Sequence, residues 1–214
     1  MKKNLTEIVF ILDRSGSMIN LVDDTIGGFN AMIEKQKQEP GEAYVSTVLF
    51  NHENQVVHDR VNVHKVQPMT RKDYVPAGCT ALLDAVGSAI HHIGNVHKYA
   101  REEDVPEHTI FVITTDGMEN ASRRYTYHQV KEKIVRQQQK YGWEFIFLGA
   151  NIDAADCAAT IGIHADRAAN FVADSAGAEA TFASVNEAVR QVRANAPMQA
   201  NWKAQVDADF NRRR

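Results

Sequence analysis

Short runs of apolar residues, many of them β-branched or aromatic, recur along the chain between longer polar segments. Unbroken apolar runs of this length are typical of strands that are buried on both faces, as in a parallel sheet. These runs cover residues 8–12, 44–50, 109–114 and 143–148, with a weaker one at 168–173. Residues 55–66 instead alternate apolar and polar positions, which predicts an edge strand that pairs back onto residues 44–50 through a turn at 51–54.

Apolar residues spaced three and four apart fill the segments between these runs and predict amphipathic helices. Four stripes have this spacing: Val22, Ile26, Phe29 and Ile33; Leu82, Leu83, Val86, Ile90 and Ile93; Val130 and Ile134; and Phe182, Val185, Val189 and Val192. Strands that alternate with helices predict an α/β fold. We therefore expect a doubly wound, mostly parallel sheet with one antiparallel edge strand and helices on both faces.

The length of the chain, 214 residues, suits one sizeable domain. We expect this domain to cover residues 1–195, including its final helix, because no linker or low-complexity tract interrupts that stretch. Beyond it, Trp202, Val206 and Phe210 are spaced four apart. Residues 196–214 therefore form either a short docking helix or a partly ordered tail.

Composition and charge narrow the class of function. The formal net charge is −3 and the only basic run is at residues 212–214, so we expect no nucleic-acid partner. No apolar run approaches the length of a membrane span, and residues 1–12 lack the pattern of a signal peptide. Cys79 and Cys157 form neither a disulfide framework nor a zinc motif, which favours a reducing compartment. We expect a cytoplasmic protein without a membrane partner, and the oligomeric state stays open.

Oxygen-bearing side chains follow the predicted strands at three places. Asp13, Ser15 and Ser17 come directly after the first strand, Asp116 follows the strand at 109–114, and Thr80 precedes the second amphipathic helix. In an open α/β sheet, ligands bind outside the carboxyl ends of the strands, where the strand order reverses. A set of carboxylates and hydroxyls without imidazole or thiolate favours Mg²⁺, Mn²⁺ or Ca²⁺ over zinc or copper.

Each of these residues also has a purely structural interpretation. Asp13 and Thr80 could be helix N-caps, and Asp116 with Gly117 could be an ordinary turn. Glu119 and Asn120, just beyond, are expected at the rim of the site. The agreement of all three places in one chain favours metal binding over three unrelated turns.

The histidines and cysteines are not expected to take part. His52, His58 and His64 lie in the predicted edge hairpin and are expected to face solvent. His91, His92 and His97 share a predicted helix without the four-residue spacing of a helical metal pair. Cys79 is expected to be a small buried residue, because no histidine is placed by the sequence to activate it.

The motif Asp13-x-Ser15-Gly16-Ser17 after an apolar strand resembles the first loop of the metal ion-dependent adhesion site (MIDAS) of von Willebrand factor type A domains. Thr80 matches the threonine of the family's second loop, and Asp116-Gly117 matches the aspartate of its third. The resemblance covers roughly residues 5–175 and all three loops, and it is to a stand-alone domain of the bacterial type.

The resemblance implies a role for each matched residue. Ser15 and Ser17 would coordinate the cation directly, while Asp13 would act largely through water. Thr80 and Asp116 would exchange direct for water-mediated coordination as the site changes state. A carboxylate from a partner protein would complete the octahedron, so the resemblance implies a protein-binding module with Mg²⁺, or else Mn²⁺ or Ca²⁺.

Two other functions compete with this one. The first is a metal-dependent phosphohydrolase on a similar sheet, but haloacid dehalogenase-like phosphatases need a second acid where this chain has Ser15. Neither a phosphate loop ending in Gly-Lys-Ser/Thr nor a Gly-x-Ser-x-Gly elbow is present. The second is a scaffold that needs no metal, which the complete oxygen set disfavours. We expect a binding protein and not an enzyme.

Overall fold

The computed structural model describes residues 1–213, in which six strands form one sheet in the order β3-β2-β1-β4-β5-β6. The strands are β1 (Lys2–Asp13), β2 (Glu42–Phe50), β3 (Asn54–Asn62), β4 (Pro106–Thr115), β5 (Glu144–Ala150) and β6 (Ala168–Phe171). All neighbours pair in parallel except β2 and β3, which are antiparallel. The predicted fold class, including its antiparallel edge strand, is confirmed.

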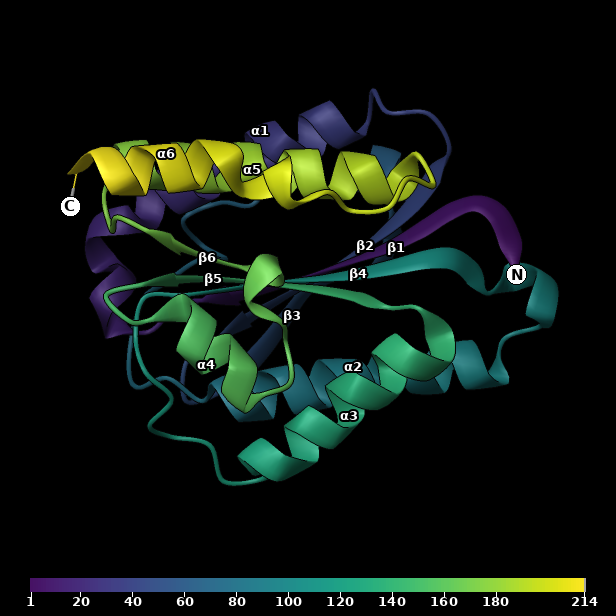
Figure 1. Ribbon diagram of the computed structural model, residues 1–214, viewed down its shortest axis with the longest axis horizontal. Helices are drawn as coiled ribbons and strands as arrows, with labels where there is room; N and C mark the ends of the chain where they lie inside the picture. Colours follow the sequence, from purple (N-terminus) through teal and green to yellow (C-terminus); the bar gives the residue numbers. More distant parts are fainter. Residues whose placement is uncertain (214) are drawn as a thin grey trace.

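Helices cover both faces of this sheet (Figure 1). One face carries α1 (Val22–Gln36), α5 (Ser175–Arg193) and α6 (Ala204–Arg213), and the other carries α2 (Leu82–Tyr99), α3 (Tyr127–Tyr141) and α4 (Ala154–Thr160). Short 3₁₀ turns lie at Gly16–Leu21, Val63–Lys65, Glu102–Asp104, Ala165–Arg167 and Ala200–Lys203. Within residues 1–213, no helix has the length and apolarity that crossing a membrane would require.

The central strand β1 divides the core into two parts. Ile8, Phe10 and Leu12 pack under α1 and α5, whereas Val9 and Ile11 pack under α2 and α3. All five side chains are buried, because successive residues of a strand point to opposite faces and both faces are covered. Residues 8–12 are therefore all apolar because both faces of β1 are covered by helices.

The segment after α5, which ends in α6, packs against α5 and β6. Trp202 is buried and its indole N–H donates to the carbonyl of Asp166 at 2.9 Å. Val206 is fully buried on α6, which contacts α5 and β6. The apolar positions of this last helix therefore extend the core on the α1–α5 face.

The expectation that His58 faces solvent is wrong. His58 is buried, its ring stacks on Phe29 with centroids 6.1 Å apart, and its nitrogens lie 3.1 Å from Thr47 Oγ1 and 3.1 Å from the carbonyl of Gln67. The β2–β3 register shifts on both sides of the pair Thr47–His58, once between Val45 and Thr47 and once between Thr47 and Val48. Each shift interrupts the alternation of faces along β3, and between the two shifts His58 points inward. Its burial lowers the pKa of His58.

Candidate metal site at the carboxyl edge of the sheet

Asp13 is the last residue of the central strand, and its side chain is fully buried. Its Oδ1 accepts the backbone N–H of Ser15 at 2.7 Å, and its Oδ2 accepts the hydroxyl of Thr115 at 2.6 Å. Burial raises the pKa of Asp13, these hydrogen bonds oppose the shift, and the nearby charge of Asp116 adds to it. The carboxylate is thus held in one orientation by the loop after β1 and by the last residue of β4.

The two serines connect the first loop to the third. Ser15 Oγ lies 3.1 Å from Ser17 Oγ, and Ser17 Oγ donates to Asp116 Oδ1 at 2.7 Å. This is possible because β1 and β4 are parallel neighbours, so Asp13 and Asp116, at their carboxyl ends, lie at the same edge of the sheet. The structure therefore links the side-chain oxygens of Ser15, Ser17 and Asp116 in one chain, and Asp13 joins it through the backbone N–H of Ser15.

The loop that carries Thr80 closes over the first loop. Gly16 N–H donates to the carbonyl of Gly78 at 3.0 Å. Gly78 has a φ of +72°, and a Cβ there would lie 2.2 Å from Nδ1 of His52, so this approach requires glycine. The loop can pass between the first loop and the β2–β3 turn only because position 78 has no side chain.

Thr80 in turn is tied to the third loop. The backbone N–H of Thr80 donates to Asn120 Oδ1 at 2.9 Å, and the backbone N–H of Asn120 donates to the carbonyl of Thr80 at 3.0 Å. A Cβ on Gly117 would lie 3.8 Å from Thr80 Oγ1, so the buried hydroxyl of Thr80 lies beside the residue after Asp116. The three loops meet at one point of the sheet edge.

Two structural interpretations of these residues are wrong. The N-cap of α2 is Ala81, so Thr80 does not cap that helix. The 3₁₀ turn after β1 has Ser15 as its N-cap, without a side-chain cap, so Asp13 does not cap it either. Cys79, which was expected to be buried, is exposed, because Thr80 takes the inward position at this loop.

The sequence suggested that Glu119 lines the rim of the site, but its carboxylate has a structural role as well. Its carboxylate accepts three backbone N–H groups, from Leu83 at 2.9 Å, Ala121 at 2.9 Å and Ser122 at 2.7 Å, as well as the Ser122 hydroxyl at 2.8 Å. Asp84 accepts three further backbone N–H groups from residues 123–125. The two acids fasten the third loop to the start of α2.

Two other residues support the site, and sequence reasoning missed the first of them. The hydroxyl of Tyr74 donates to the carbonyl of Asp13 at 2.5 Å from a fully buried position, and burial raises the pKa of this phenol. Asn151 Nδ2 lies 3.5 Å from the carbonyl of Asp116. Tyr74 is 61 residues away from its acceptor, so no local spacing in the sequence could reveal the contact.

The donor set fits a small divalent cation. No group of three or more His, Cys, Asp or Glu residues that could hold a metal occurs within residues 1–213, so this site depends on hydroxyls. Neighbouring corners of an octahedron are about 2.9 Å apart when metal–oxygen distances are about 2.05 Å. The separations of Ser15 Oγ from Ser17 Oγ, 3.1 Å, and of Ser17 Oγ from Asp116 Oδ1, 2.7 Å, bracket that value.

No protein-family model matches the chain, and the search of curated proteins gives no match either. Solved structures do resemble it. The von Willebrand factor domain of the pilus tip protein Mfa5 from Porphyromonas gingivalis has a TM-score of 0.61 at 10% identity, covering 91% of this chain and 96% of that one. Manganese-loaded TRAP protein from Plasmodium vivax has a TM-score of 0.56 at 15% identity, covering 85% and 73%.

Proximal thread matrix protein 1 from the mussel byssus has a TM-score of 0.54 at 15% identity over 88% of this chain, which spans 45% of that protein. Another structure of the mussel protein is described as having a zinc-occupied MIDAS motif. The VWA2 paralogue of ArnB from Sulfolobus acidocaldarius has a TM-score of 0.54 at 16% identity. The match covers 88% of this chain and 45% of that protein. At these identities the likeness shows the fold alone: the chain has the α/β fold of von Willebrand factor type A domains.

Proposed function

We propose that this chain binds a partner protein through one divalent cation held by Asp13, Ser15, Ser17, Thr80 and Asp116. The observation that carries the proposal is the pair of buried acids. Asp13 and Asp116 are 0% and 4% exposed, and neither forms a salt bridge within residues 1–213. Two buried carboxylates without a cation cost several kcal/mol. A bound cation would remove that cost.

The cation we propose is Mg²⁺, with Mn²⁺ or Ca²⁺ as alternatives. Mg²⁺ usually binds through one or two carboxylates and keeps several waters, which suits a set with two acids, whereas Ca²⁺ takes six to eight oxygen ligands. Both oxygens of Asp13 already accept protein hydrogen bonds, which is consistent with a role through water. Ser17 is exposed, so the cation would have a coordination position that faces solvent.

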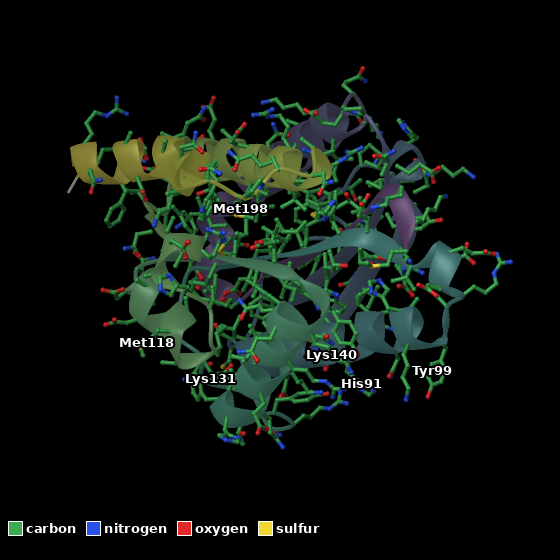
Figure 2. All side chains as sticks on the ribbon, turned by 45° about the vertical axis from the view of Figure 1, so that its right-hand side comes forward. His91, Tyr99, Met118, Lys131, Lys140 and Met198 are labelled. Atoms are coloured by element: carbon green, nitrogen blue, oxygen red, sulfur yellow. The ribbon has the colours of Figure 1, made fainter. Side chains whose placement is uncertain are left out.

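The surface around the site suits a protein partner. Each of the three loops carries an exposed apolar side chain: Ile19 is 65% exposed, Val75 52% and Met118 67%. Met118 lies on the surface of the molecule in Figure 2. Apolar side chains around a charged centre give a partner area to bury while its acidic residue reaches the cation. The free Cys79 and Cys157 are compatible with a reducing compartment, and we propose a cytoplasmic location.

Affinity capture from the native cell tests this function. We expect a partner that is captured with Mg²⁺, lost with EDTA and regained when Mg²⁺ is restored. Thr80→Ala should reduce capture at least about fivefold, because it removes one hydroxyl from the oxygen set, with little change in melting temperature. Thr160→Ala, which removes an exposed hydroxyl remote from the three loops, serves as the control. Capture that EDTA leaves unchanged would contradict the proposal.

We further propose that the chain has no hydrolytic activity of its own. A metal-assisted hydrolase needs a general base with a free lone pair near the ion. Glu119 follows Asp116 by three residues and lies outside the ligand set, and four donors occupy its carboxylate. Phosphate and carboxylate esters with Mg²⁺ or Mn²⁺ should give background rates. Turnover that requires the metal and disappears in Asp116→Ala would show a phosphohydrolase instead.

A further inference from the structure

The segment that leads from β4 to α3 carries two adjacent arginines, Arg123 and Arg124, which we call the arginine pair. Both side chains are exposed, and neither pairs with a carboxylate within residues 1–213. The sequence has no acid at residues 120–131. Two neighbouring cations without ion-pair partners, on a chain of net charge −3, concentrate positive potential at one place.

Backbone connections place the arginine pair beside the candidate metal site. Asn120 is joined to Thr80 by two hydrogen bonds, and Arg123 follows Asn120 by three residues. The Cα atoms of Asn120 and Arg123 are therefore at most about 11 Å apart. Figure 1 shows this segment running from the end of β4 to the start of α3. A partner docked on the metal loops would have the arginine pair at its border.

The backbone beneath the arginine pair is fixed. The carboxylate of Asp84, in the first turn of α2, accepts the backbone N–H groups of Arg123, Arg124 and Tyr125, each at 2.9 Å. Both of its oxygens are used in this way, and it forms no ion pair with either guanidinium. Glu119 holds the two preceding residues by their backbone N–H groups. A partner would therefore need to order only the two arginine side chains.

Charge is distributed unequally around the metal loops. The helix α3 begins at Tyr127, three residues after Arg124, and has no acid in its first turn, so its positive end adds to the potential of the arginine pair. Beyond β5, on the other side of Asp116, the start of α4 carries the exposed acids Asp153 and Asp156. An acidic partner is attracted on the first side and repelled on the second.

We propose that the arginine pair selects an acidic segment of the partner, in which further acids accompany the carboxylate that reaches the cation. The inference rests on the proposed function, which supplies that first contact. Arg123 and Arg124 would each bind one carboxylate of the segment through two parallel N–H groups, the geometry in which a guanidinium binds an acid most strongly. A partner with a single acid would still reach the cation but would leave the arginine pair unbound.

The distances define the spacing of these acids. In an extended peptide the side chains on one side recur about every 7 Å, so acids two and four positions from the metal-bound acid lie about 7 and 13 Å from it. The limit of about 11 Å between Asn120 and Arg123 falls within that range. We therefore expect the selected segment to have acids at alternate positions.

Two synthetic glycine–serine peptides test the inference by NMR titration of the purified chain in saturating Mg²⁺. One carries a single glutamate, and the other carries three glutamates at alternate positions, so that either outer glutamate can be the metal-bound one and both chain directions are sampled. We expect the three-acid peptide to bind at least about tenfold more tightly, of which the number of carboxylates accounts for about threefold. In Arg123→Ala/Arg124→Ala this advantage should fall to about threefold or less, while calorimetry still detects Mg²⁺ binding.

Arg136→Ala/Lys140→Ala is the matched control, because it removes two exposed cations from the C-terminal half of α3, where Figure 2 labels Lys140. This variant should keep the full advantage. The inference is overturned if the control loses the advantage equally, if Arg123→Ala/Arg124→Ala keeps it, or if the three-acid peptide does not bind at millimolar concentration. EDTA separates the two proposals. Peptide binding that EDTA leaves unchanged contradicts the metal-bridged contact, whereas Mg²⁺-dependent binding without preference for the three-acid peptide contradicts only the inference.

Discussion

Asp116→Ala is expected to weaken Mg²⁺ binding about 100-fold or more, to the point where calorimetric titration detects no site. Asp116 supplies one of only two acids in the proposed ligand set, and its Oδ1 also fixes the hydroxyl of Ser17 at 2.7 Å. The substitution therefore removes half of the negative charge that would hold the ion and releases a second oxygen. The wild-type chain, freed of metal by a chelator, should bind one Mg²⁺ per molecule.

Asp156→Ala is the matched control for this experiment. Asp156 is exposed in the first turn of α4, at the same edge of the sheet, but belongs to none of the three loops. Its loss should leave the affinity for Mg²⁺ within about twofold of the wild type, because a solvent-exposed charge outside the first shell is screened. If Asp116→Ala retains the wild-type affinity, the assigned ligand set is incorrect.

Thermal unfolding offers a second measurement on the same variants. Saturating Mg²⁺ at about 100 times its dissociation constant should stabilise the wild type by about 2.7 kcal/mol, because the ion binds only the folded chain. The Asp116→Ala variant should show no such response. A variant that still gains stability from Mg²⁺ would place the ion elsewhere.

The sheet could be predicted because its strands are buried on both faces. Ile8–Leu12 is apolar throughout, since β1 lies at the centre and helices cover both its sides. The ends of the strands escaped prediction where polar residues take part: β1 starts at Lys2, six residues before the apolar run, and its Thr6 and Glu7 are buried although they are polar. Such ends are held by backbone pairing, which polar residues can make as well as apolar ones.

The candidate site was predictable for a related reason. Asp13 and Asp116 each stand next to an apolar strand, so parallel pairing of those strands suffices to bring them together. His58 was not predictable, because two register shifts in the β2–β3 pairing change the face to which it points. The role of Glu119 was also hidden, because its partner Leu83 lies 36 residues away and offers only a backbone N–H.

Arg193 is the clearest case of a residue whose role no pattern in the sequence predicts. It ends α5 and is buried, yet no carboxylate pairs with it within residues 1–213. Its guanidinium donates instead to the carbonyl of Gln36 at 2.6 Å and to the side-chain oxygen of Gln36 at 3.0 Å. Three further carbonyls, at residues 39–41, accept from it at 3.0–3.2 Å. One side chain thus holds the end of α1 and the turn into β2.

We expect Arg193→Ala to destabilise the fold by about 3–5 kcal/mol, because it leaves several buried carbonyls without donors and opens a cavity. For a domain of this size the melting temperature should fall by roughly 10 °C. Arg190→Ala is the control on the same helix. Arg190 is exposed and pairs with Glu187 at 2.7 Å, a surface ion pair whose loss costs about 1 kcal/mol or less.

Arg193→Lys separates the geometry of the guanidinium from its charge. An ammonium keeps the charge but has three donors on one atom, so it cannot span the carbonyls at both Gln36 and residues 39–41. We therefore expect Arg193→Lys to recover less than half of the stability lost in Arg193→Ala, as measured by urea unfolding. Full recovery would mean that charge alone matters, and an effect of Arg193→Ala no larger than that of Arg190→Ala would mean that water replaces the guanidinium without cost.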